Sequence, residues 1–242
     1  LNLDINSSKF TYVYLDVKNQ PWNKSKAINH ALKYYVDMPY CFIADVDMLF
    51  KPNFIDTALE LTTKHNFFYF QVAYLKQHLV NEKDFFYTNN LKNISNYEAT
   101  GMTVFKTNIL KSIQGFDEFF HFWGAEDTDV HNRITNLGHK VHFYNENVLM
   151  AHQWHPSYII SQSNKLTQKI QLSNIIEINH LHLKYNLINK ITKVNDVNWG
   201  EIQSNNLLKN IKVNNLPSYK SDVLYWINQI INNLQSGDED RK

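Results

Sequence analysis

Acidic side chains gather in two short stretches of this 242-residue chain. Asp45 and Asp47 directly follow the apolar run at 40–44, and the second stretch is E-D-T-D at 126–129. Carboxylates repel one another, so a protein gathers them where a cation or a proton-transfer reaction uses their charge. The two stretches therefore indicate an enzyme that works with a divalent metal ion.

The first stretch has the spacing of a cation site. Because Asp45 and Asp47 are separated by one residue, both side chains point to the same side of an extended segment. Two such carboxylates offer the oxygen ligands that Mg²⁺ and Mn²⁺ prefer, and these ions also bind phosphate oxygens. An exposed turn can carry the same D-x-D pattern without a metal. Its position after a buried strand favours a site, because open α/β sheets bind ligands at strand ends.

The second stretch falls in the first turn of a helix predicted over 125–137. One alternative is that Glu126 and Asp127 only complement the helix dipole, which favours acids at an N-terminus. That alternative leaves the preceding Trp123 and Gly124 without a reason. A positioned carboxylate beside an aromatic ring suits a general base that acts on a sugar hydroxyl. The ring would stack on the apolar face of a pyranose.

A histidine completes the candidate metal site. His152 follows a strand predicted over 148–151, and neutral imidazole is a suitable third ligand beside two carboxylates. The chain has 11 histidines, and most histidines in proteins are structural. Because His152 follows the last predicted strand, it is the first candidate for the histidine ligand, and His155 is the second.

Composition narrows the class of protein. A hydrophobic fraction of 43% predicts a packed core, and a net charge of +1 argues against a nucleic-acid partner. The single cysteine, Cys41, excludes an intrachain disulfide and fits a reducing compartment. No apolar stretch approaches the roughly 20 residues that a membrane span needs. We therefore expect a cytoplasmic protein without a membrane span.

The order of predicted elements indicates the fold class. Strands are predicted at 11–17, 40–44, 67–72, 100–105, 141–144 and 148–151, and helices at 22–35, 54–64, 107–113 and 125–137. This alternation predicts an α/β fold with a mixed, mostly parallel sheet flanked by helices. A long loop is predicted over 73–99. After Pro156 the pattern changes to three predicted helices, near 162–190, 204–211 and 220–235.

The motifs taken together resemble a known family. In chain order they are D-V-D at 45–47, G-M-T-V-F at 101–105, G-F-D-E at 115–118, W-G-A-E-D at 123–127 and A-H-Q at 151–153. Their order and spacing resemble the GT-A (Rossmann-like) glycosyltransferases. The closest similarity is to galactosyl- and N-acetylgalactosaminyltransferases with a W-G-G-E-D motif, including the bacterial chondroitin-polymerase type. The resemblance covers roughly residues 10–156.

The resemblance implies roles for the acidic residues and the histidine. Asp47 and His152 would hold Mn²⁺ (or Mg²⁺) at the diphosphate of a nucleotide sugar. Asp45 would contact the nucleotide ribose or the metal shell. Asp127 would be the catalytic base, and Glu126 would hold hydroxyl groups of the donor or acceptor.

The resemblance also implies donor contacts elsewhere. Residues 26–29 (K-A-I-N) are similar to a K-A-R-N element that the family carries upstream of D-x-D. This similarity makes Lys26 and Asn29 candidate donor contacts, with Lys26 at a phosphate or simply solvated on its helix. Trp123 would line the sugar site.

The domain organisation follows from the same resemblance. Residues 1–156 would form the GT-A catalytic domain, and 157–242 a helical C-terminal extension that covers the core or mediates assembly. The family's first strand normally lies further upstream than Leu1, so we expect the N-terminal nucleotide-binding strand to be missing or truncated. The second glycine of W-G-G-E-D is Ala125 here, which we expect to be a mild change at a helix start.

The implied function is metal-dependent transfer of a hexosyl group, of the Gal/GalNAc type, from a UDP-sugar to a glycan hydroxyl with inversion. Bacterial surface polysaccharide synthesis would suit such a chain. One alternative is a metal-dependent phosphoesterase, which would use the same carboxylates and His152 for two ions and leave Trp123 without a role. The other is a glycan-binding protein without catalysis.

Overall fold

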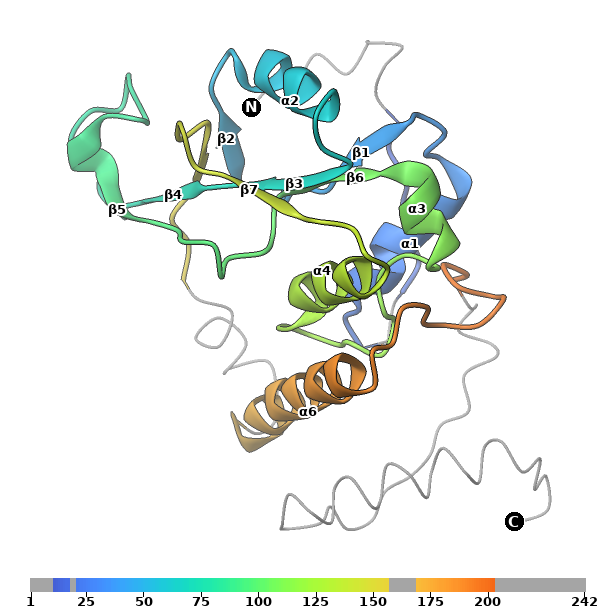
Figure 1. The fold of residues 1–242 in the computed structure, drawn as a ribbon. Coiled ribbons are helices and arrows are strands. Elements are labelled where there is room, and N and C mark those ends of the chain that lie inside the picture. The colour runs from blue at the N-terminus through green and yellow to red at the C-terminus, as the bar shows by residue number, and fades with distance from the viewer. Residues whose placement is uncertain (1–10, 18–20, 157–168, 203–242) are drawn as a thin grey trace, which may run out of the picture.

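The computed structural model describes residues 11–17, 21–156 and 169–202, and these form a mixed α/β fold (Figure 1). The strands are β1 Tyr40–Phe42, β2 Met48–Phe50, β3 Phe67–Phe70, β4 Val72–Leu75, β5 Leu91–Ile94, β6 Thr103–Lys106, β7 His142–Tyr144 and β8 Met150–His152. The helices are α1 Lys24–Tyr34, α2 Phe54–Thr62, α3 Thr107–Ser112, α4 Glu126–Asn136 and α6 Lys169–Ile188, with a 3₁₀ turn at Thr88–Asn90.

Two four-stranded sheets meet where β3 runs into β4. Their strand orders are β1-β6-β3-β7 and β2-β8-β4-β5. Only Gln71 separates β3 from β4, and its backbone N–H donates to Tyr144 O at 3.0 Å. The chain therefore passes from one sheet into the other at Gln71, and β7 and β8 run parallel to β3 and β4.

The strand directions correct one part of the predicted class. The mixed α/β fold with flanking helices is confirmed, but among the described strands four pairings are antiparallel and two are parallel. The apolar run at 40–44 contains β1, which pairs antiparallel with β6 at the edge of its sheet. A continuous apolar run indicates that both faces of a strand are buried. It does not indicate whether the neighbouring strand runs parallel or antiparallel.

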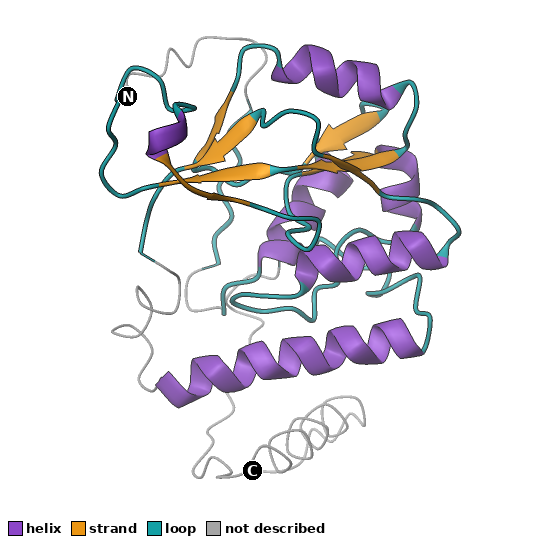
Figure 2. Cartoon of the chain, turned by 60° about the vertical axis from the view of Figure 1, so that its left-hand side comes forward, coloured by secondary structure: helices purple, strands orange, loops and turns teal. Residues whose placement is uncertain are grey.

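The core lies on both faces of β3. Phe67 packs toward α1, α3 and α4, in a cluster with Leu32, Leu110, Val130 and Ile134. Phe68 and Phe70 point to the other face, in a cluster with Phe54 and Leu61 of α2. Side chains alternate along a strand, so β3 is buried on both sides. Figure 2 shows α2 on one side of the strands and α1, α3 and α4 on the other.

Two predicted elements are wrong. Residues 11–17 form no strand, and 73–99 is not a loop throughout, because it contains most of β4, the 3₁₀ turn and β5. β5 has the sequence L-K-N-I and is largely exposed at a sheet edge, so it lacks the apolar alternation that would have revealed it. The predicted helices at 204–211 and 220–235 lie outside the described residues.

Helix α6 packs on α4 through buried polar groups. Asn186 of α6 donates to Asp129 Oδ1 of α4 at 2.8 Å, and Asp129 also accepts from Arg133 Nε at 2.7 Å. A buried ion pair needs such extra hydrogen bonds to offset its lost hydration. The described part of the C-terminal extension is thus fastened to α4, while the boundary at residue 156 stays a prediction. None of the described helices has the length and apolar content needed to cross a membrane.

His131 of α4 gives the fold a pH dependence. The side chain is buried, and Thr103 Oγ1 lies 2.8 Å from its Nε2. Burial lowers the pKa of His131 to about 4, whereas an unfolded chain protonates histidine near pH 6.5. Because the unfolded state then binds more protons, we predict that the unfolding free energy falls from pH 6.5 toward pH 4, by about 3 kcal/mol in total.

Urea unfolding at pH 7.5, 5.5 and 4.5 measures this loss. His131→Gln keeps a donor for Thr103 and removes the titrating ring, so the variant should lose less stability over the same range. An identical pH dependence in the variant and the wild type would show that His131 is not its source.

Candidate functional site

The register of β2 and β8 brings Asp47 to His152. Met48 lies opposite His152 in this antiparallel pair, and the Gln153 N–H donates to Asp47 O at 3.0 Å. Asp47 Oδ2 lies 3.4 Å from His152 Nε2 and 3.2 Å from His155 Nε2. The structure therefore places the predicted ligands Asp47 and His152 together and adds His155.

These three side chains fit a divalent metal ion. Their ligand-type atoms lie within 4.8 Å of one another. Asp47 Oδ1 is buried and has no hydrogen-bond partner among the described residues. An unsatisfied buried oxygen is costly, and a cation would satisfy it. One carboxylate with two imidazoles suits Mn²⁺ better than Mg²⁺, which prefers oxygen ligands.

A second cluster forms around an ammonium group. Lys24 Nζ lies 3.2 Å from Asp45 Oδ1, 3.5 Å from Asp127 Oδ2 and 3.8 Å from Glu126 Oε1. Lys24 is the first residue of α1, whose N-cap is Asn23, and Glu126 is the first residue of α4. The N-termini of both helices therefore meet at this cluster. Asp45, predicted as a metal or nucleotide contact, is paired here with Lys24.

The electrostatics of this cluster favour proton transfer. Burial raises the pKa of Asp127, with Asp45 adding to the rise and Lys24 opposing it. Burial and the charge of Asp127 likewise raise the pKa of Glu126. Burial alone would lower the pKa of Lys24, but Asp127, Asp45 and Glu126 outweigh it and hold Lys24 charged. A carboxylate with a raised pKa is a stronger proton acceptor than an ordinary aspartate.

The turn that begins α4 is strained. Gly124 has φ +100° and Ala125 has φ +79°, in the left-handed region. A residue with a Cβ pays about 1–2 kcal/mol there, whereas glycine does not. The alanine is therefore a costlier change than the sequence suggested, and it occupies the helix N-cap next to Glu126. The Trp123 side chain just before this turn is 51% exposed.

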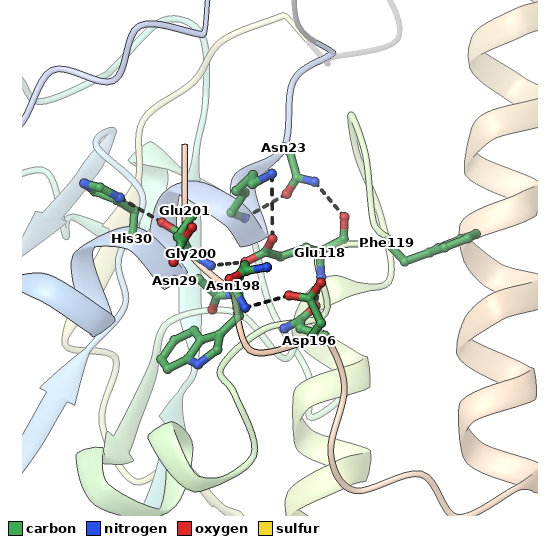
Figure 3. A network of polar contacts seen from close by, with 12 residues as sticks. Asn23, Asn29, His30, Glu118, Phe119, Asp196, Asn198, Gly200 and Glu201 are labelled. Atoms are coloured by element: carbon green, nitrogen blue, oxygen red, sulfur yellow. Dashed lines mark hydrogen bonds and ion pairs between the residues drawn. The ribbon is translucent and has the colours of Figure 1, made fainter. Parts of the chain in front are cut away.

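Asn29 lies in a different network, which Figure 3 shows around Glu118, and Lys26 lies near the same carboxylate. Asn29 is fully buried, and its Nδ2 donates to Phe116 O at 2.8 Å and to Glu118 Oε1 at 2.9 Å. Gly200 N also donates to Glu118 Oε1, at 2.6 Å, and Lys26 Nζ lies 3.9 Å from Glu118 Oε2. These contacts give Asn29 a structural task, and donor binding by Lys26 and Asn29 stays a prediction.

Sequence reasoning missed Lys24. Both Lys24 and Lys26 belong to the first turn of α1, and the family motif drew attention to Lys26. A residue two positions away on a helix lies about 200° around its axis, so only one of the two can face the acidic cluster. The capping residue Asn23 marks where the helix begins, but only the meeting of α1 with α4 decides which lysine faces the acids.

A model of one protein family matches the part of the chain that carries the acidic motif. Residues 83–155 match the family model described as the N-terminal domain of galactosyltransferase. The matched segment contains Glu126, Asp127, His152 and His155, and it covers less than a third of the chain. No curated protein matches this sequence.

The crystal structure of S. aureus TarS 1-349 in complex with UDP-GlcNAc is a solved structural neighbour. It is 11% identical to this chain, and the alignment covers 72% of this chain and 54% of that one, with a TM-score of 0.38. The chain thus spans about half of the TarS structure. The segment that matches the family model carries both the acidic pair and the two histidines.

The strained turn yields a stability prediction. Ala125→Gly should relieve the left-handed strain while making the unfolded chain more flexible, for a net gain of about 0.5–1 kcal/mol. Ala27→Gly in α1 is the matched control, because glycine in a regular helix should cost about 0.5–1 kcal/mol. Urea unfolding of both variants measures the two signs, and destabilisation by Ala125→Gly would contradict the strain.

Proposed function

We propose that this chain is a GT-A-type, metal-dependent inverting glycosyltransferase. It would move a hexosyl group, with galactose or N-acetylgalactosamine favoured, from a UDP-sugar to a glycan hydroxyl. A role in cytoplasmic assembly of a bacterial surface polysaccharide suits this activity. One observation supports this proposal most strongly. Asp127, whose pKa is raised, and Asp45 both contact Lys24, and Asp45 is two residues from Asp47, which belongs to the candidate metal site.

Asp127 would act as the general base. Its carboxylate would take the proton from the acceptor hydroxyl as that oxygen attacks the anomeric carbon. The bond from the anomeric carbon to the diphosphate oxygen breaks on the opposite side, so the configuration inverts. Lys24 would hold Asp127 and Glu126 in place, and Glu126 would accept hydrogen bonds from sugar hydroxyls.

The other residues would bind the donor. Asp47, His152 and His155 would hold the divalent ion, and Asp45 would contact the nucleotide ribose. When bound, Mn²⁺ or Mg²⁺ would neutralise the charge that develops on the departing diphosphate. The exposed ring of Trp123 would stack on a sugar.

The two alternative functions, a phosphoesterase and a glycan-binding protein, leave more of these residues without a role. A two-ion phosphoesterase needs a second ligand set. Among the described residues one group of three ligands forms, and Asp45 is paired with Lys24. A glycan-binding protein without catalysis would have no use for a proton acceptor with a raised pKa at Asp127. Isothermal titration with UDP, with and without Mn²⁺, tests both.

Metal-dependent nucleotide binding should depend on Asp47. Asp47→Asn keeps the size of the side chain but removes its charge, so UDP binding in the presence of Mn²⁺ should weaken by about tenfold or more. Titration calorimetry measures this change. Asp37→Asn removes an exposed carboxylate just before β1 and is the control, expected to bind as wild type. Unchanged Mn²⁺-dependent affinity in Asp47→Asn would remove Asp47 from the site.

Transfer itself should depend on Asp127. Asp127→Asn removes proton acceptance, so transfer from a UDP-sugar should fall by roughly 10²–10⁴ while UDP binding stays near wild type. The helix-dipole alternative predicts near-normal turnover and a loss of stability of at most about 1 kcal/mol. Asp56→Asn is the control, because Asp56 lies in the first turn of α2 and is exposed. Turnover of Asp127→Asn within a few-fold of wild type would reject the base.

A further inference from the structure

Glu118 ends the G-F-D-E stretch at 115–118, to which the proposed reaction gives no role. Its backbone O accepts from Asn23 Nδ2 at 2.7 Å, and its Oε1 accepts from Asn29 Nδ2 at 2.9 Å (Figure 3). Asn23 is the N-cap of α1, and Asn29 lies inside the same helix. Glu118 therefore fastens α1 at two points, one before and one after Lys24, the residue with which the helix begins.

A segment of the C-terminal extension, residues 195–201, holds Glu118 in place. The Glu118 N–H donates to Asn195 Oδ1 at 2.9 Å, and Gly200 N donates to Glu118 Oε1 at 2.6 Å. The Glu118 side chain is 17% exposed. Hydrogen bonds to a carboxylate are stronger than those between neutral groups. Both the backbone and the side chain of Glu118 thus depend on segment 195–201.

Segment 195–201 also lies directly against α1. His30 Nδ1 lies 2.8 Å from Gly200 O. Gly200 has φ +73°, and a Cβ on it would lie 2.8 Å from Asn29 O and 3.1 Å from His30 N. A side chain at position 200 would therefore force the segment away from the helix backbone, and glycine permits this close approach. The segment packs on α1 at the same place where Glu118 binds the helix.

Helix α6 holds the loop that continues from Glu118 toward α4. Asn179 of α6 is buried, and its Nδ2 donates to His121 O at 2.9 Å and to Trp123 O at 3.1 Å. One amide group therefore fixes the loop just after Glu118. With the loop fixed to α6, Glu118 has a defined place from which it binds α1.

The place of α1 decides how close its ammonium group comes to the acidic cluster. Lys24 Nζ lies 3.2 Å from Asp45 Oδ1, 3.5 Å from Asp127 Oδ2 and 3.8 Å from Glu126 Oε1. Attraction between opposite charges weakens with distance. Burial and Asp45 raise the pKa of Asp127, and Lys24 opposes this rise. If Lys24 moved away, Asp127 would therefore stay protonated to a higher pH.

We propose that Glu118 and segment 195–201 position Lys24 against the acidic cluster. The inference rests on the proposed function, and it makes part of the C-terminal extension necessary for the reaction. Glu118 acts through α1 and Lys24, without a contact to donor or acceptor, so it is a positioning residue. The G-F-D-E stretch thereby gains a role that its place in the sequence does not reveal.

Gly200→Ala tests the segment without changing any residue of the acidic cluster. Transfer from UDP-galactose to N-acetylglucosamine should fall about 10- to 100-fold at pH 7. The acid limb of kcat/KM against pH should move up by as much as about one pH unit, because Lys24 no longer opposes the rise in the pKa of Asp127. Gly138→Ala is the matched control. Gly138 has φ +87° with open space around its Cβ position, so the variant has similar backbone strain and should keep the wild-type profile.

Two substitutions at Glu118 separate positioning from a merely structural role. Glu118→Ala removes the acceptor for Asn29 and Gly200, so it should move the pH profile as Gly200→Ala does. Glu118→Gln keeps an acceptor oxygen at that place and should recover most of the wild-type profile. A structural role would lower the free energy of unfolding in Glu118→Ala and leave the pH profile where it was, which would overturn the positioning role.

Titration of the Asp127 carboxyl group by carbon-13 NMR separates this inference from the proposed function, because it needs no reaction. The midpoint should lie higher in Gly200→Ala than in wild type, and Gly138→Ala should match wild type. Asn195→Ala leaves Gly200 in place and is the milder variant, with a smaller change in the same direction. This result in a protein that transfers no sugar would reject only the transferase. Midpoints equal to wild type in the folded variants of this series would overturn the positioning role.

Discussion

Repulsion between carboxylates is the constraint on which the rest of this structure depends. Asp45, Glu126 and Asp127 lie around the single ammonium group of Lys24, and Asp47 follows Asp45 by two residues. One positive charge cannot balance this many negative ones, so burial and mutual repulsion raise the pKa of both Glu126 and Asp127. Further positive charge or a proton would relieve this repulsion, and this property makes the cluster suited to chemistry.

The fold meets this requirement with few elements. The N-termini of α1 and α4 deliver Lys24 and the acidic pair, and helix N-termini also favour the negative charges placed there. The β2–β8 register brings His152 to Asp47, while α6 braces the loop before α4. Strain at Ala125 shows that the turn into α4 is held by its surroundings against its local preference.

How much the sequence could predict differs between the fold and the site. The helices α1 to α4 followed from apolar periodicity, and Asp47 and His152 followed from their places at strand ends. β5 escaped prediction because an exposed edge strand needs no apolar alternation, and the antiparallel pairing of β1 escaped because burial does not encode direction. Lys24 could not be chosen over Lys26, since only the three-dimensional meeting of α1 and α4 decides which lysine faces the acids.

We propose that Asp47, His152 and His155 hold a divalent ion next to the acidic cluster. Crystals grown with Mn²⁺ and UDP, measured at the manganese absorption edge, test it most directly. We expect an anomalous peak between the carboxylate of Asp47 and the two imidazoles, at roughly 2.0–2.6 Å from the ligand atoms. A peak elsewhere on the molecule, or UDP bound at this site without any manganese peak, would contradict it.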